Sequence, residues 1–481
     1  MNDVKKLIGE ISMVLLLNVG VHGQAVTIDS MEIPLRYMGN PYTVIPASEQ
    51  GFVLLSERFN QEDLNKKFWD VLLYNPDLER FSVLLIETEH MFGLFGHAYH
   101  DSKVYLLFAG IKDLKKQLYI HEIDLVKQTS QKIPIDTYLP DQISYFSNFF
   151  NSLIIGGRDQ GKNSFIFFDL ENKNLTILQG IFTRRSEILD IRQDTSNQLF
   201  TMIITYVNNR NQIALNLRSY DPFGQPIEDI RIDPEDNVEF LNVRTIIVNN
   251  NLRIIGGTYR NIKMQHTGGV FLGSIQLDGN QTLTYYPLEE IFQLLDSMNG
   301  PDIKYTSSDL AHFLKEDVWN ASQLYEIGKG NAIILEGFNN QRYYASTGNL
   351  KKIFVYDLGL IIGFNDHLEI NWVNDFNMKN TITNEFDYHI NLVDNGDRQK
   401  LYYFYLNRLN EKIINGPETI KPEYPVTLIY PEYKGDDPIS YNNDLSKFQA
   451  WYDDYYLFSG VKSFEGPEGN PIFFVHKIAY R

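Results

Sequence analysis

Three histidines and several acidic residues within fifteen positions form the densest group of titratable side chains. The chain contains Glu87-Thr88-Glu89-His90, and His97 and His100-Asp101 follow. Imidazole and carboxylate groups at close range can bind a metal such as zinc. If residues 92–99 form a strand, however, His90 and His100 lie about 30 Å apart, because a strand rises about 3.3 Å per residue. His97 and His100 would also point to opposite faces, so we predict no metal site here.

A second candidate is a set of arginine-bearing segments that follow predicted strands and would lie at one face of the protein. The candidate binding residues are Arg158, Asp159, Arg184, Arg185, Tyr259, Arg260 and His266. In a chain of net charge −18, arginines concentrated on one face could bind an acidic group through bidentate hydrogen bonds. Ordinary solvated loops are the alternative interpretation of the same residues.

Sequence motifs for catalysis are absent. The chain contains no HExxH metalloprotease motif, no Gly-x-Ser-x-Gly elbow and no phosphate-binding loop. It also lacks a calcium loop with alternating acids and a terminal glutamate. The sequence therefore identifies no catalytic residues, and we predict no metal and no cofactor.

Composition and the N-terminus indicate where the protein acts. The net charge of −18 argues against binding nucleic acid or an anionic membrane. Lys5 and Lys6 precede the apolar run 11–21, and small or compatible residues follow at 21–23, which is typical of a signal peptide over 1–23. No later run approaches 18 apolar residues, so we expect no membrane-spanning segment after cleavage. The predicted location is the periplasm, the cell surface or the medium.

A repeated stretch organises the rest of the chain. Residues 152–157 end in Ile-Ile-Gly-Gly, and residues 252–257 end in the same four residues. We interpret this stretch as the second strand of a repeating unit. Its eight predicted copies are 52–56, 104–110, 152–157, 199–206, 252–257, 331–337, 388–393 and 455–460.

A second periodic feature is an Asp or Asn at a turn, in which the predicted third strands tend to end. Asp124, Asp169, Asp221, Asp278 and Asn365 occupy this position, and both residue types favour tight turns. Four antiparallel strands per unit of about 50 residues indicate an all-β fold, a β-propeller. We predict eight blades, with seven as the alternative if two units are one split unit.

The chain ends allow the ring to close. A strand near residues 25–30 precedes the first unit, and the last unit ends with a strand at 471–480. Pairing of the two would complete one blade and remove an exposed edge, so residues 25–481 are predicted to form a single domain. Residues 288–319 interrupt the strand pattern with two short helices, the second capped by Ser307 or Ser308. We expect this insertion to pack against the side of the propeller, with a partner-binding element or a lid as the alternative.

The glycine pairs Gly156-Gly157 and Gly256-Gly257 resemble the double glycine of kelch repeats, although the kelch tyrosine and tryptophan are not recognisable. The C-terminal third resembles exported β-propeller proteins of unknown function from Bacteroidetes-type bacteria. The features that carry this resemblance are the segment from Gly363 through Trp372 and the pair Asp394-Asn395. The resemblance implies a propeller fold and supplies no active-site residues.

The function most consistent with these features is a non-catalytic exported propeller. It would bind a protein or a glycan at the cell envelope. The alternative is a propeller hydrolase or lyase acting on polysaccharide, with acids supplied by several blades. Two close carboxylates in the central channel, one with a raised pKa, would favour the enzyme.

Overall fold

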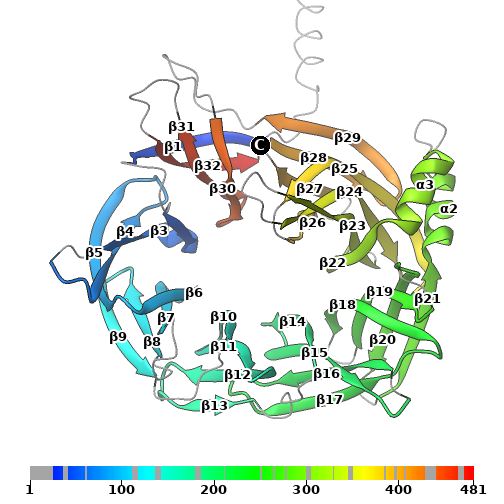
Figure 1. Ribbon diagram of the computed structural model, residues 1–481, viewed down its shortest axis with the longest axis horizontal. Coiled ribbons are helices and arrows are strands. Elements are labelled where there is room, and N and C mark those ends of the chain that lie inside the picture. The colour runs from blue at the N-terminus through cyan, green and yellow to red at the C-terminus, as the bar shows by residue number, and fades with distance from the viewer. Residues whose placement is uncertain are drawn as a thin grey trace, which may run out of the picture.

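Eight four-stranded antiparallel sheets form the blades of a ring in the computed structural model (Figure 1). The predicted all-β propeller with eight blades is therefore confirmed, and the alternative of seven blades is wrong. The structure describes residues 25–35, 42–59, 62–110, 118–135, 142–178, 186–210, 212–249, 252–263, 266–276, 279–298, 305–328, 330–344, 350–383, 386–394, 398–405, 408–427, 440–463 and 471–480. The predicted signal peptide lies outside these residues.

Blades one to four follow one another along the chain, and a 3-10 turn, η1 (Ser48–Gln50), joins the first two strands. Blade one contains β2 (Thr43–Pro46), β3 (Phe52–Phe59), β4 (Lys66–Tyr74) and β5 (Arg80–Glu89). Blade two contains β6 (Phe92–His100), β7 (Lys103–Gly110), β8 (Leu118–Asp124) and β9 (Thr129–Ile135). Blade three contains β10 (Gln142–Phe149), β11 (Ser152–Asp159), β12 (Lys162–Asp169) and β13 (Leu175–Ile177). Blade four contains β14 (Ile188–Asp194), β15 (Leu199–Val207), β16 (Ile213–Tyr220) and β17 (Pro226–Ile232).

Blades five to eight complete the ring, and the last blade includes the first strand of the chain. Blade five contains β18 (Val238–Asn249), β19 (Leu252–Asn261), β20 (Gly269–Gln276) and β21 (Gln281–Pro287). Blade six contains β22 (Val318–Ile327), β23 (Gly330–Tyr344), β24 (Leu350–Phe364) and β25 (Ile370–Thr383). Blade seven contains β26 (Asn391–Asp394), β27 (Gln399–Tyr405), β28 (Arg408–Asn415) and β29 (Glu418–Thr427). Blade eight contains β30 (Ser440–Ala450), β31 (Tyr455–Ser463), β32 (Ile472–Tyr480) and β1 (Ala25–Pro34).

The predicted closure of the ring by the chain ends is confirmed. Strand β1 pairs antiparallel with β32, from Ala25 opposite Tyr480 to Pro34 opposite Ile472. Met31 and Ile33 of β1 pack against the buried cluster that joins blades eight and one. The N-terminal strand thus covers the edge of β32, and the two ends of the chain hold each other in one blade.

Seven of the eight predicted second strands coincide with the second strand of a blade, and one prediction is wrong. The sequence pattern predicts 388–393 as a second strand, but the second strand of blade seven is β27. Residues 391–394 instead form β26, the short first strand of that blade. An apolar run of this length is compatible with either position, because periodicity alone does not say which strand of a sheet it forms.

The predicted turn after each third strand is confirmed where the structure describes it. Oδ1 of Asp124, Asp169, Asp221 and Asn365 each accepts two backbone N–H bonds from the residues that follow, at 2.8–3.1 Å. These side chains replace the strand ladder with local hydrogen bonds and turn the chain into the fourth strand. Asp278, the fifth predicted member, lies outside the described residues.

The repeated glycines mark a close contact between the first two strands of a blade. A Cβ atom at Gly157 would lie 1.8 Å from the carbonyl oxygen of Gln142, and at Gly257 2.0 Å from that of Asn242. The register of each first strand is irregular beside this position. No side chain fits there, so glycine at these positions allows the two strands to pack closely.

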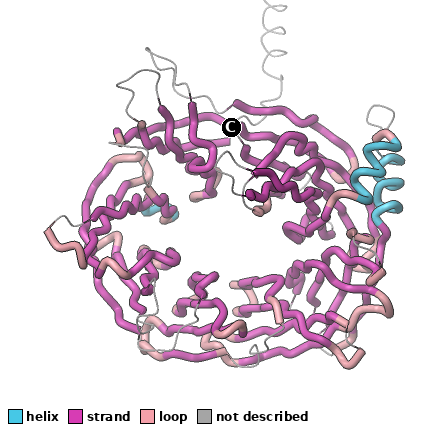
Figure 2. Tube along the Cα trace, viewed as in Figure 1, coloured by secondary structure: helices cyan, strands magenta, loops and turns pink. Residues whose placement is uncertain are grey.

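Two helices, α2 (Leu288–Met298) and α3 (Ser307–Lys315), lie at the outer side of the ring beside β25 and β21 (Figure 2). Their buried residues join one apolar cluster with strands of blades five and six. The helix α3 is capped by Thr306, which exchanges hydrogen bonds with Asp309. The prediction of Ser307 or Ser308 as the cap is wrong by one or two residues, because the capping box selects the threonine three residues before an acid.

Candidate functional site

The described arginines of the predicted set, Arg158 and Arg260, lie on blades three and five, with blade four between them. Arg158 is at the end of β11, and its Nη2 lies 3.9 Å from Glu187 Oε1, which precedes β14 of blade four. Arg260 is on β19, and its guanidinium contacts Glu239 Oε2 of the neighbouring strand β18 at 2.6 Å. Each described arginine of the set therefore already has an acidic neighbour, with which an acidic ligand would compete.

The other members of the predicted set are dispersed. Asp159 follows Arg158 on β11, and His266 lies in the connection from β19 to β20. The ring of Tyr259 packs edge-on against Tyr285 at 5.2 Å between centroids, and burial raises the pKa of Tyr259. Arg184 and Arg185 lie outside the described residues. The binding role of these residues stays a prediction.

The histidines near residue 90 belong to separate environments, as the strand geometry predicts. His90 follows β5 in a turn and contacts the ring of Phe59, whereas His97 is on β6. Burial lowers the pKa of His97. Among the described residues, they belong to no group of three metal-ligating side chains.

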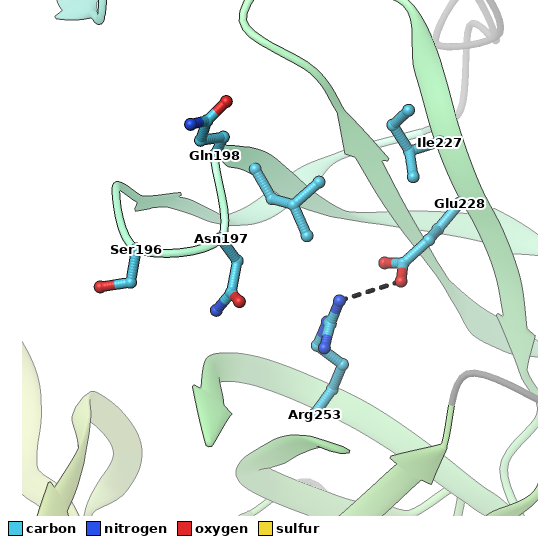
Figure 3. A pocket seen from close by; sticks show the side chains of 7 residues that line it. Ser196, Asn197, Gln198, Ile227, Glu228 and Arg253 are labelled. Atoms are coloured by element: carbon cyan, nitrogen blue, oxygen red, sulfur yellow. Dashed lines mark hydrogen bonds and ion pairs between the residues drawn. The ribbon is translucent and has the colours of Figure 1, made fainter. Parts of the chain in front are cut away.

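One cavity, of about 430 Å³, lies between blades four and five (Figure 3). It is lined by Ser196, Asn197, Gln198, Leu199, Ile227, Glu228 and Arg253. Arg253 Nη2 donates to Glu228 Oε1 at 3.0 Å, and both side chains are buried. Glu228 also accepts from Ser219 Oγ at 2.7 Å. The charges in this cavity are compensated within the protein, which makes it a poor site for a charged ligand.

A second cavity, of about 400 Å³, lies between blades six and seven, and we call it the amide-lined cavity. It is lined by Ile327, Gly328, Gly330, Asn331, Phe364, Asn371, Trp372, Gln399, Asn415 and Gly416. These residues include four side-chain amides and one indole, and none of them is charged. Its volume is within the range of small-molecule sites.

The indole and one amide of the amide-lined cavity are held in place by neighbouring groups. A Cβ atom at Gly363 would lie 2.0 Å from Trp372 Cε2, so the glycine allows the indole to lie against β24. Asn331 is buried at 1% exposure and donates from Nδ2 to Asp366 Oδ1 at 3.2 Å. Its Oδ1 accepts no hydrogen bond from the described residues.

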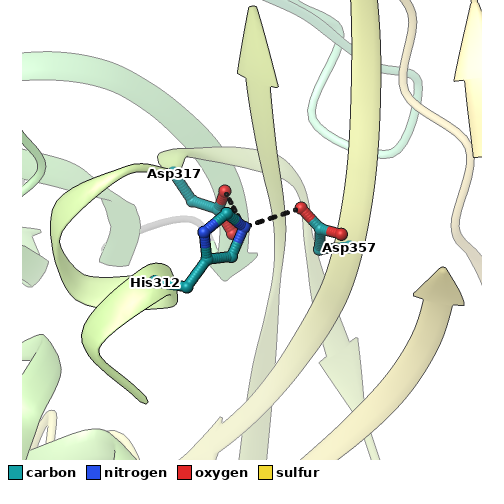
Figure 4. Close-up of side chains that lie close together, drawn as sticks. All are labelled: His312, Asp317 and Asp357. Atoms are coloured by element: carbon teal, nitrogen blue, oxygen red, sulfur yellow. Dashed lines mark hydrogen bonds and ion pairs between the residues drawn. The ribbon is translucent and has the colours of Figure 1, made fainter. Parts of the chain in front are cut away.

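A third feature, the histidine–aspartate cluster, consists of His312, Asp317 and Asp357 (Figure 4). His312 is on α3, Asp317 is between α3 and β22, and Asp357 is on β24. His312 Nε2 lies 3.3 Å from Asp357 Oδ2 and 3.5 Å from Asp317 Oδ1. Asp317 is 1% exposed, and neither of its carboxylate oxygens accepts a hydrogen bond of good geometry from the described residues.

A local irregularity in blade six directs Asp357 toward the helix. In the pairing of β23 with β24, Phe338 lies opposite Tyr356 and Gly337 lies opposite Leu358, so Asp357 is an extra residue without a partner on β23. Such a bulge re-aims one side chain. Figure 4 shows the Asp357 carboxylate pointing from β24 toward the imidazole of His312.

The electrostatics of the histidine–aspartate cluster follow from burial and from three charges at close range. Burial, together with the charge of Asp357, raises the pKa of Asp317 to about 7. Burial lowers the pKa of His312, but its hydrogen bond to Asp357 and the charges of both aspartates outweigh this and raise it. The two aspartates meet the predicted criterion of close carboxylates with one raised pKa. They lie where the helices meet blade six, however, whereas the criterion requires the central channel.

Sequence reasoning missed both the amide-lined cavity and the histidine–aspartate cluster. Their residues come from separate strands and from a helix–strand connection, so no spacing in the sequence brings them together. A partial signal existed for the cluster. The segment His312-Phe313-Leu314-Lys315-Glu316-Asp317 places a histidine and two acids at the end of a predicted helix.

Comparisons with known proteins show a similarity of fold and no match to a family. No known protein family and no curated protein matches the chain. Sqt1 from Chaetomium thermophilum is 10% identical, with 95% of this chain and 100% of that chain covered and a TM-score of 0.45. The β-propeller domain of the Trilobed protease from Pyrococcus furiosus is 11% identical, with 80% and 93% covered and a TM-score of 0.38. The polysaccharide lyase Uly1 is 7% identical, with 79% and 88% covered and a TM-score of 0.39. The chain is similar to these solved structures in fold alone.

Among the described residues, no helix has the length and apolar character needed to cross a membrane.

Proposed function

We propose that this propeller is a non-catalytic exported binding protein that recognises a neutral, hydroxyl-rich glycan in the amide-lined cavity. The observation that carries the proposal is the composition of that cavity, which combines the indole of Trp372 with the amides of Asn331, Asn371, Gln399 and Asn415. Amides can both donate and accept hydrogen bonds, as sugar hydroxyls do, and an indole provides a flat apolar surface for the face of a sugar ring.

The charge of the cavity favours an uncharged ligand. The described lining residues carry no charged side chain, so neither an anionic nor a cationic ligand would find a partner of opposite charge there. The Oδ1 atom of Asn331 is buried without a donor among the described residues. Burying such a group unsatisfied costs about 1–3 kcal/mol, and a ligand hydroxyl that reached it after a movement of the Asn331 side chain would recover that cost.

The cavity is also organised before a ligand arrives. Gln399 Nε2 donates to Asp394 Oδ1 at 3.1 Å, and Gln399 Oε1 accepts from the Gly416 backbone at 3.4 Å. The Trp372 indole is fixed beside Gly363. Side chains that are ordered in the free protein lose less conformational freedom on binding, which favours affinity.

The test is a glycan array screen with the full chain, followed by calorimetric titration of each hit. Trp372→Ala should weaken binding at least tenfold, which corresponds to about 1.4 kcal/mol. Phe223→Ala, which removes an exposed aromatic ring on blade four, is the matched control and should bind as the parent does. Ligand binding should also change tryptophan fluorescence, because Trp69, Trp319 and Trp451 are buried whereas Trp372 is partly exposed in the cavity.

Two results would overturn the proposal. One is the absence of any neutral glycan ligand on the array, and the other is unchanged binding by the Trp372→Ala variant. Incubation with a bound oligosaccharide also tests the alternative of a polysaccharide hydrolase or lyase. Release of shorter products by the parent would replace the binding function with that activity.

A further inference from the structure

We propose that the histidine–aspartate cluster binds one divalent transition-metal ion, with Zn²⁺ the best match. The ligands would be Nε2 of His312 and one carboxylate oxygen each from Asp317 and Asp357. These residues differ from those of the amide-lined cavity, so the proposal goes beyond the glycan-binding function and stands independently of it.

The spacing of the donor atoms fits a small metal ion. Four ligands arranged tetrahedrally about Zn²⁺ at about 2.0–2.2 Å lie about 3.3–3.6 Å from one another. His312 Nε2 lies 3.3 Å from Asp357 Oδ2 and 3.5 Å from Asp317 Oδ1. The three donor atoms all lie within 4.8 Å of one another. Two of the three distances between donor atoms therefore already have the required length. A small movement of one carboxylate would bring the third distance, between the two aspartate oxygens, into the same range.

The environment of Asp317 is the second, independent observation. Its side chain is 0% exposed, and neither oxygen accepts a hydrogen bond of good geometry from the described residues, while the Asn339 side chain lies close enough to lower the pKa of Asp317. A buried ionised carboxylate is unfavourable unless a cation or hydrogen-bond donors compensate its charge. Protonated His312 would supply one positive charge between two aspartates, whereas a divalent ion would balance both carboxylates.

Hydrogen bonds outside the cluster orient its ligands as metal sites require. His312 Nδ1 lies 3.0 Å from Glu316 Oε2, which favours the tautomer that leaves a lone pair on Nε2. Asn339 Nδ2 donates to Asp357 Oδ2 at 3.3 Å. A carboxylate that accepts from the far nitrogen of a ligating histidine is common in zinc sites, where it fixes the ring.

The packing of α3 keeps the cluster in place. Trp319 Nε1 donates to the carbonyl oxygen of Phe313 at 2.8 Å, and both side chains are buried. Asp357 comes from the bulge in β24. His312 on the helix and Asp357 on the strand are thus held by rigid elements, and Asp317 lies in the two-residue connection between α3 and β22.

The ligand types select among metals. One imidazole with two carboxylates suits zinc and its neighbours among the transition metals, whereas Ca²⁺ prefers six to eight oxygen ligands. Three protein ligands leave one coordination position for water or another ligand. The side chain of His312 is 34% exposed, which gives the ion a path from solvent.

The test is titration of the chelator-treated full chain with Zn²⁺ by calorimetry and with Co²⁺ by visible absorption. We expect one Zn²⁺ per chain and the absorption bands of a tetrahedral Co²⁺ site. His312→Ala and Asp357→Asn should each weaken Zn²⁺ binding at least 100-fold and abolish the bands. Glu316→Gln should weaken it about 10–100-fold. His367→Ala, which removes an exposed histidine elsewhere on blade six, is the matched control and should bind as the parent does.

Circular dichroism establishes that each variant is folded, and the partly exposed position of His312 makes its alanine variant the safest of them. No stoichiometric Zn²⁺ binding by the parent would overturn the proposal and leave a histidine paired with two carboxylates. Binding by His312→Ala equal to that of the parent would also overturn it. Equal affinity for Ca²⁺ and Zn²⁺ would contradict ligation by the imidazole.

Discussion

A buried ion pair between blades six and seven tests how adjacent blades are held together. Lys412 Nζ on β28 donates to Asp375 Oδ1 on β25 at 2.6 Å and to the Asp375 carbonyl oxygen at 2.7 Å. The two side chains are 4% and 7% exposed, and the Tyr305 hydroxyl also donates to Asp375. Replacing Lys412 with Met keeps a side chain of similar length but removes the cationic partner of a buried carboxylate.

The expected cost follows from that burial. Removing one partner of a buried ion pair destabilises a protein by about 3–5 kcal/mol. Unfolding entropy is about 2.1 cal/mol/K per residue, so a ring of about 450 residues has about 1 kcal/mol/K. Lys412→Met should therefore lower the Tm by about 3–5 °C. The double variant Lys412→Met with Asp375→Asn should be at least as stable as either single variant, because neither charge is then buried.

Scanning calorimetry and urea denaturation of the four proteins measure these differences. Lys379→Met is the matched control, since Lys379 is exposed on β25, and its effect should stay within about 0.5 kcal/mol. If the Tm and the free energy of unfolding of Lys412→Met equal those of the control, the ion pair does not stabilise the interface between blades six and seven. A double variant that loses the sum of both single effects would equally refute the reasoning.

Two further predictions concern pH and the closure of the ring. Burial raises the pKa of Glu336 from 4.5 to about 7, so the folded state binds a proton that the unfolded chain has lost. The free energy of unfolding should then fall by about 3 kcal/mol between about pH 4.5 and 7 because of this group. Glu336→Gln should reduce that fall when unfolding is measured across the range. A variant with the same pH dependence as the parent would exclude Glu336 as its source. Deleting residues 25–34 exposes the edge of β32 and the apolar cluster that Met31 and Ile33 cover, which should cost at least about 3 kcal/mol and promote aggregation through the edge. A deletion variant with the parental Tm and no increase in light scattering would contradict the closure.

Periodic features of the sequence were sufficient to predict the fold. Several blades repeat the same local chemistry, such as the side chain of Asp169, whose Oδ1 accepts backbone hydrogen bonds from Glu171 and Asn172. These signals are local, so they are visible without the tertiary structure. The one misplaced second strand, 388–393, overlaps β26, the first strand of its blade. The apolar pattern of such a short run does not say which strand of a sheet it forms.

The candidate sites could not be predicted in the same way, because each combines residues that the ring brings together from distant segments. Trp372 lies on blade six, whereas Gln399 and Asn415 belong to blade seven. Asp357 faces His312 because a bulge adds one residue to β24. A bulge that re-aims a side chain has no distinct sequence pattern here, and the histidine is 45 residues away along the chain.

The sequence by itself determined the repeating strands, the turns between them and the pairing of the chain ends. These features depend on alternating apolar residues and on glycine, aspartate and asparagine at turns, which act over a few neighbouring positions. The tertiary structure alone decided which side chains meet between blades and beneath the helices. That outcome depends on the packing of whole sheets against one another, and it determines both the amide-lined cavity and the histidine–aspartate cluster.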